Sequence, residues 1–80
     1  MSEFAEAVQR NVGERVRALR AARGLTQREL AGRVQISRPS IANVEAGRQN
    51  VGLRQLCALA DALGVGVGEL LAEVRREPAE

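Results

Sequence analysis

The sequence has almost none of the residues on which metal sites, disulfides and aromatic stacking depend. It holds one cysteine, Cys57, no histidine, no tryptophan and no tyrosine, and Phe4 is its only aromatic residue. One cysteine cannot form an intrachain disulfide, and a structural zinc site needs about four Cys or His ligands. Proteins that read single-stranded nucleic acid stack bases on aromatic side chains. The composition therefore argues against a metalloprotein, a disulfide-stabilised domain and a single-strand binder.

Catalytic groups and membrane segments are also missing. Without histidine, no nucleophile–base pair or ligand cluster is available, so we expect no enzyme and no cofactor. No N-terminal stretch is long and apolar enough for a signal peptide or a membrane span. Together with the single cysteine, this favours a reducing, cytoplasmic location. Eighty residues make one domain, which we expect to cover about residues 1–75 before a short polar tail at 76–80.

Positive charge is concentrated in the middle of the chain. All twelve basic residues are arginine, against ten acids, for a net charge of +2. Residues 15 to 54 hold nine arginines and two acids, a local charge of +7, and the other residues hold three arginines and eight acids, or −5. A basic centre between acidic ends is typical of a face that binds phosphates. Arginine suits bidentate contacts with guanine or phosphate, although a genome-wide coding bias is the simpler reason for the missing lysine.

Apolar residues recur at helical spacing along nearly the whole chain. The first predicted helix runs from about residue 3 to 23. Its apolar residues are separated by four, four, four and three positions, which places them on one side of the helix. These residues are Phe4, Val8, Val12, Val16 and Leu19. Further helices are predicted over about 27–34, 37–46, 53–63 and 67–75. They place Leu30, Ala31, Val34, Ile41, Val44, Leu56, Cys57, Ala60, Leu63, Leu70, Leu71 and Val74 on their apolar faces. Five helices with short links predict an all-α bundle.

Capping signals mark where the second and third helices begin. Thr26 and Glu29 form a capping box, in which each side chain can bond the backbone amide of the other. Ser37 is a predicted N-cap, and Pro39 falls in the first turn, where its missing N–H costs little. Two short helices separated by about three residues, over roughly 25–46, describe a helix-turn-helix.

The residues of this segment resemble those of the XRE or Cro/phage-repressor family. The resemblance rests on 24–31 and 36–48, continues into 59–65 and 69–71, and covers roughly residues 12 to 72. It implies a five-helix, lambda-repressor-like domain that binds operator DNA as a dimer with its third helix in the major groove. Controller proteins of restriction–modification systems are stand-alone relatives of this kind.

The resemblance also implies roles for individual residues. Gln27 matches a position that contacts a phosphate and braces the recognition helix, and Arg20 with Glu45 matches a buried ion pair. Positions that face base edges or the adjoining backbone are matched by Arg38, Pro39, Ser40 and Asn43. A second phosphate-contact region is matched by Arg48, Gln49 and Asn50. Gln27 heads a helix whose N-terminal amides also attract phosphate. We add its neighbours Thr26 and Arg28 to the first region, although a solvated helix face is the default interpretation for Arg28.

Several residues allow two interpretations. Arg38 could pair with guanine O6 and N7, which we favour, or clamp a phosphate. Pro39 could touch a thymine methyl or only shape the start of the helix. Cys57 is interpreted as a buried core residue, since a redox sensor would need an exposed thiol of low pKa. Phe4 and Val8 could cover the core. The interpretation we favour places them in a dimer interface with Leu70, Leu71 and Val74.

Three positions depart from the family pattern. Gln35 stands where the turn usually has glycine, which would cost about 1 kcal/mol if its backbone is left-handed. Gly52 and Gly66 replace Ser or Thr caps, a loss of a few tenths of a kcal/mol. The pattern still predicts a homodimeric, sequence-specific transcription regulator on a pseudo-palindrome, which blocks or contacts RNA polymerase. The alternatives are an antitoxin that also binds a toxin, and an interaction module without DNA binding.

Overall fold

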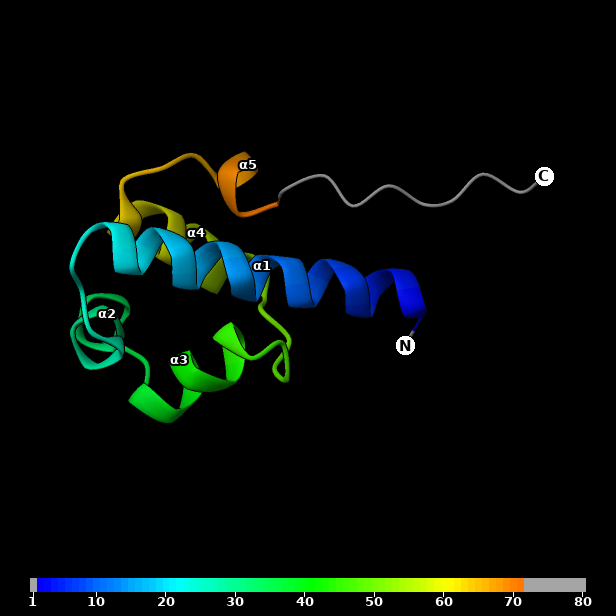
Figure 1. Ribbon diagram of the computed structural model, residues 1–80, viewed down its shortest axis with the longest axis horizontal. Coiled ribbons are helices and arrows are strands. Elements are labelled where there is room, and N and C mark those ends of the chain that lie inside the picture. The colour runs from blue at the N-terminus through cyan, green and yellow to red at the C-terminus, as the bar shows by residue number, and fades with distance from the viewer. Residues whose placement is uncertain (1, 72–80) are drawn as a thin grey trace.

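The fold is a bundle of short helices around one long helix. The structure is a computed structural model, and it describes residues 2–71. The helices are α1 (Glu3–Ala22), α2 (Gln27–Val34), α3 (Arg38–Glu45), α4 (Leu53–Leu63) and α5 (Val67–Leu70). In Figure 1, α2 and α3 lie on one side of α1 and α5 on the other, and the N-terminal turns of α1 extend past α3. The predicted all-α, five-helix architecture is confirmed for the described residues.

The helices begin at the residues that the capping signals predict. The Glu29 amide donates to Thr26 Oγ1 at 3.0 Å and the Thr26 amide to Glu29 Oε1 at 2.8 Å, which completes the capping box. These hydrogen bonds lower the pKa of Glu29. The hydroxyl of Ser37 caps α3 by accepting from the Ser40 amide at 3.1 Å. Gly52 cannot cap through a side chain, and none caps α4.

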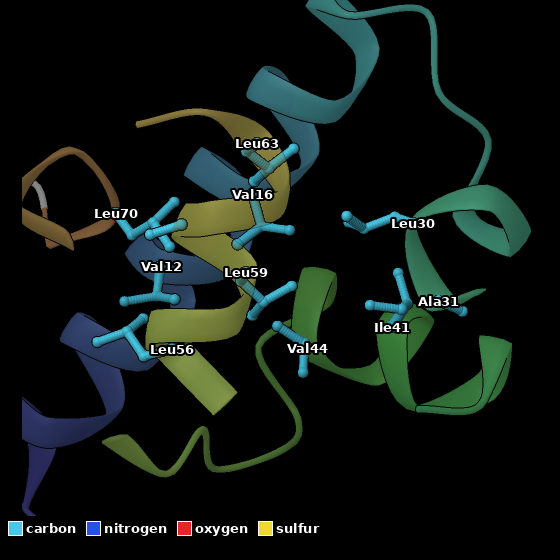
Figure 2. Packing of buried hydrophobic residues seen from close by; sticks show 11 residues of the cluster. Val12, Val16, Leu30, Ala31, Ile41, Val44, Leu56, Leu59, Leu63 and Leu70 are labelled. Atoms are coloured by element: carbon cyan, nitrogen blue, oxygen red, sulfur yellow. The ribbon is translucent and has the colours of Figure 1, made fainter. Parts of the chain in front are cut away.

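The core is one cluster to which every helix contributes (Figure 2). Its members are Val12, Val16, Leu30, Ala31, Ile41, Val44, Leu56, Leu59, Ala60, Leu63 and Leu70. One prediction is wrong: Cys57 is exposed, and Leu59 is buried in its stead. The buried face of α4 follows the spacing 56, 59, 60, 63, and a residue at 57 lies about 100° further round the helix.

The last helix differs from its prediction. It ends at Leu70, not near residue 75, and Leu70 is fully buried. Leu70 therefore belongs to the core and has no surface left for a partner, which corrects its assignment to the dimer interface. Leu71 is 45% exposed, and Val74 lies outside the described residues. Arg15 holds α5 on α1 by donating to the Glu69 carbonyl at 2.9 Å and to its carboxylate at 3.1 Å.

Gly13 explains how closely α1 and α3 approach. A Cβ at this position would overlap the carbonyl oxygen of Val44 and lie 2.8 Å from that of Glu45. Local propensity alone makes a glycine inside a helix a weak point, worth about 1 kcal/mol relative to alanine. The glycine lets the backbone of α1 touch the last turn of α3, and this contact sets the position of the helix-turn-helix on its scaffold.

Candidate nucleic-acid interface

The turn between α2 and α3 has the geometry of a helix-turn-helix. Gln35 ends α2 with φ 58° and ψ 43°, so the left-handed conformation considered for this position is present. A non-glycine residue there costs about 1 kcal/mol. Leu30 and Ile41 are fully buried on either side of the turn, and they fix the two helices against the core.

A buried ion pair ties α3 to α1, as the family resemblance implies. Arg20 Nε lies 2.6 Å from Glu45 Oε2, and its Nη2 donates to Oε1 at 3.1 Å. The remaining terminal nitrogen donates to the Leu25 carbonyl at 2.7 Å. The two side chains are only 15% and 4% exposed, and the hydrogen bonds to Glu45 raise the pKa of Arg20. The carboxylate is thus neutralised and hydrogen-bonded where an unpaired charge would be costly.

Gln27 continues this network onto the start of the recognition helix. Its Nε2 donates to Glu45 Oε1 at 3.0 Å, and its Oε1 accepts from Arg38 Nη1 at 3.1 Å. Because both ends of the amide are used, its orientation is set by Glu45 and passed on to Arg38. The bracing role predicted for Gln27 is present in the structure. A contact between Gln27 and a phosphate stays a prediction, for which the amide has one further N–H.

The outward face of α3 is narrow and mostly apolar. Ile41, Val44 and Glu45 are buried, so the opposite side of the helix is the one open to a ligand. That side presents Pro39, Ala42, Asn43 and Ala46, which are exposed or half-buried. Sequence reasoning missed the two alanines, although their positions opposite Ile41 and Val44 on a 3.6-residue helix would have indicated them.

Arg38 and Ser40 lie on the two flanks of that face. Arg38 is turned toward α2 by its bond to Gln27. Ser40 Oγ accepts from the Ser37 hydroxyl at 3.0 Å, so it is already part of the helix cap. Asn43 is therefore the polar side chain nearest the middle of the outward face.

The residues predicted to contact phosphates fall into two groups at opposite ends of α3. The first group surrounds Gln27, which touches Arg38 at the start of the helix. The second group comprises Arg48, Gln49 and Asn50, in the loop after the helix. The Arg48 amide donates to the Asn43 carbonyl at 2.9 Å, and Gln9 of α1 donates to the Gly47 carbonyl at 2.9 Å. A duplex that receives α3 would thus meet polar groups on both sides.

Comparison with known proteins agrees with this geometry. Residues 11–74 match the family model described as a helix-turn-helix domain. The chain belongs to this helix-turn-helix family. It is 40% identical over 72 residues to an immunity repressor protein of Bacillus phage phi105, covering 86% of this chain and 50% of the relative. It is 44% identical over 61 residues to an HTH-type transcriptional regulator of Deinococcus deserti, covering 76% and 47%. The chain thus spans about half the length of these two relatives.

A solved structure shows the same fold in a protein of similar size. The restriction–modification controller protein of Aeromonas hydrophila superposes with a TM-score of 0.77 at 39% identity, covering 80% of this chain and 97% of that one. Within residues 2–71, this helix-turn-helix domain has no group of three or more side chains that could hold a metal ion. None of the helices described here is long and apolar enough to cross a membrane.

A second surface lies near the N-terminal end of α1, away from the Arg20–Glu45 pair. Phe4 is 37% exposed and Leu71 45% exposed. A hollow of about 130 Å³ opens beside Leu71, and it is lined by Ala5, Val8, Gln9, Val12, Asn50, Val51, Leu56 and Leu71. The Oε1 of Gln9 is buried there without a hydrogen-bond partner among the described residues. Val8 and Leu71 of the predicted dimer interface thus line one apolar hollow, and Phe4 directly precedes its lining residue Ala5 in the chain.

Proposed function

We propose that this helix-turn-helix domain is a sequence-specific regulator of transcription that inserts α3 into the major groove of double-stranded DNA. The observation that carries the proposal is the hydrogen-bonded chain from Arg20 through Glu45 and Gln27 to Arg38. It fixes the start of α3 and holds the Arg38 guanidinium beside Gln27, on one flank of the outward face. Such pre-organisation suits a helix that must place side chains against base edges. The names of the repressor and regulator relatives support the same function.

The regulator acts as a homodimer on a pseudo-palindrome whose half-sites lie about 34 Å apart. Among residues 2–71, the predicted interface residues that retain accessible surface are Phe4, Val8 and Leu71, and the last two line the apolar hollow. A small core gains stability from such burial. Occupation of the promoter blocks RNA polymerase or contacts it, and the protein acts in the cytoplasm, where its DNA is.

The dimer is tested by substituting glutamate for leucine at two exposed positions, one inside and one outside the proposed interface. Leu71→Glu should lower the molar mass measured by sedimentation to that of the monomer, because it places a charge in the interface. Leu53→Glu is the matched control, since Leu53 is 75% exposed on α4, outside the residues lining that hollow. An unchanged dimer in the Leu71 variant, or equal loss in both variants, would refute this interface.

DNA binding is tested by selecting duplexes from a random pool and titrating them by fluorescence anisotropy at several salt concentrations. A regulator should prefer the selected duplex over a scrambled one, and its affinity should fall steeply with salt. Arg38→Ala should cost about 1–3 kcal/mol on the selected duplex and relax the preference at one base position. Equal weakening on all sequences would make Arg38 a phosphate clamp. Absent or salt-independent binding would overturn the proposed function.

A further inference from the structure

A polar hollow of about 340 Å³ separates α1 from the outward face of the recognition helix. It is lined by Arg17, Arg20, Gln27, Ala42, Glu45 and Ala46. None of the predicted roles uses this hollow as a whole. Two parts of the lining have already been described. Gln27 braces α3, and Ala42 and Ala46 lie on the outward face of α3. Arg17 is a lining residue that none of the predicted roles includes.

The side of α1 that faces α3 is defined by Gly13, Arg17 and Arg20. Their spacing of four and three places them on one face of the helix. Gly13 touches the α3 backbone and Arg20 binds Glu45, so Arg17 lies between two points where α1 meets α3. Its side chain thus stands beside the recognition helix and not on a remote surface.

The charge of the hollow comes from Arg17 alone. Arg20 and Glu45 neutralise each other in their bidentate pair. Arg17 is exposed, and within residues 2–71 its guanidinium has no hydrogen bond or ion pair. The hollow is therefore a site with one unpaired positive charge, a guanidinium that can bind an oxyanion through two parallel hydrogen bonds.

The small side chains of Ala42 and Ala46 leave this site open toward the same side as the reading face of α3. A helix of about 10–12 Å diameter fills a major groove about 12 Å wide, so the phosphates of the groove wall lie directly beside it. A longer side chain at residue 42 or 46 would separate that wall from Arg17. The alanines instead allow a strand to approach α1.

We propose that the hollow between α1 and α3 binds a phosphodiester of the DNA backbone, with Arg17 as the residue that contacts it. The proposal rests on the proposed function, which supplies the duplex. It makes α1 a third DNA-contacting element beside α2 and α3. The contact is sequence-independent, so it adds affinity and sets the docking angle without changing which bases are preferred.

The experiment compares two arginines of the same helix. Arg17→Gln should reduce the slope of log K against log salt by about 0.9, the value for one phosphate contact. This corresponds to an affinity about fivefold weaker at 0.15 M salt, when the two lines are extrapolated to meet at 1 M. Arg17→Lys should retain the slope because it keeps the charge. Arg15→Gln is the matched control, since it removes the same charge from the opposite side of α1, where Arg15 binds Glu69.

Ethylation interference on the selected duplex locates the phosphate. One ethylated phosphate should weaken the wild-type chain and have no effect on Arg17→Gln. If Arg17→Gln and Arg15→Gln change the slope equally while binding persists, the Arg17 assignment is overturned and the proposed function stands. If the wild-type chain does not bind DNA at all, both fail. Far-UV circular dichroism of each variant confirms that the fold is retained.

Discussion

Two arginines on opposite sides of α1 each pair with a glutamate of another helix, and the two pairs differ in burial and in their further hydrogen bonds. Arg20 and Glu45 are 15% and 4% exposed and join α1 to the recognition helix. Arg15 and Glu69 are 37% and 57% exposed and join α1 to the short α5. The first pair has further hydrogen bonds from Gln27 and to the Leu25 carbonyl. The second pair stands in solvent, apart from a bond to the Glu69 carbonyl.

The difference shows that only one of these pairs is tied to the site. A buried pair must be fully satisfied, because a single unpaired charge is costly there, and this requirement fixes geometry. A surface pair is weakened by water and salt and contributes little to stability. The buried pair, whose geometry is strict, thus lies next to the recognition helix, and the exposed pair lies on the opposite side of α1.

The largest effect is expected from breaking the buried pair. Arg20→Ala leaves Glu45 buried without its charged partner, which should lower the free energy of unfolding by about 3 kcal/mol. Urea denaturation followed by circular dichroism measures this loss. A decrease no larger than that of the surface-pair variant Arg15→Ala would show that burial makes no difference between the pairs.

A smaller loss is expected from Gly13→Ala, which tests the contact that brings the buried pair together. Its new Cβ would overlap the backbone of α3, and the resulting overpacking should outweigh the gain in helix propensity, for a net loss of about 2 kcal/mol. Gly32→Ala is the control, since a Cβ at this position in α2 meets nothing within 4 Å. Thermal unfolding should show stabilisation by about 1 kcal/mol in the control. Stabilisation of both variants would contradict the close approach.

The next effect in size is a gain at the turn of the helix-turn-helix. Gln35→Gly removes the strain of a left-handed non-glycine residue and should raise stability by about 1 kcal/mol or less, since glycine also increases the entropy of the unfolded chain. The midpoint of urea unfolding reports the change. A destabilised variant would mean that the Gln35 side chain contributes contacts worth more than the strain.

The smallest effect is expected at the exposed pair. Arg15→Ala should lower the free energy of unfolding by about 0.5 kcal/mol, and the loss should shrink at high salt. The effect of Arg20→Ala should be much less sensitive to salt. A double-mutant cycle of Arg15→Ala and Glu69→Ala, measured at low and high salt, gives the coupling energy of the exposed pair. A coupling energy that does not change with salt would contradict the expected difference between the two pairs.

Much of the fold could be read from local patterns. The capping box of Thr26 and Glu29 and the cap at Ser37 involve residues three apart, so their partners are visible in the sequence itself. Cys57 shows the limit of such patterns, because apolar spacing narrows the buried face of α4 to a few neighbouring positions. Packing against the other helices then selected Leu59 and left the thiol outside.

The sequence by itself determined where the helices begin, which faces are apolar and that positive charge gathers in the middle of the chain, since these depend on neighbours within a few residues. The family pattern added the Arg20–Glu45 pair. Only the tertiary structure decided that Gly13 is a contact point, that Gln27 passes the orientation of Glu45 to Arg38, and that Arg17 stands beside a hollow. Each of these joins residues 11 or more positions apart, and their meeting depends on how α1 and α2 pack against α3.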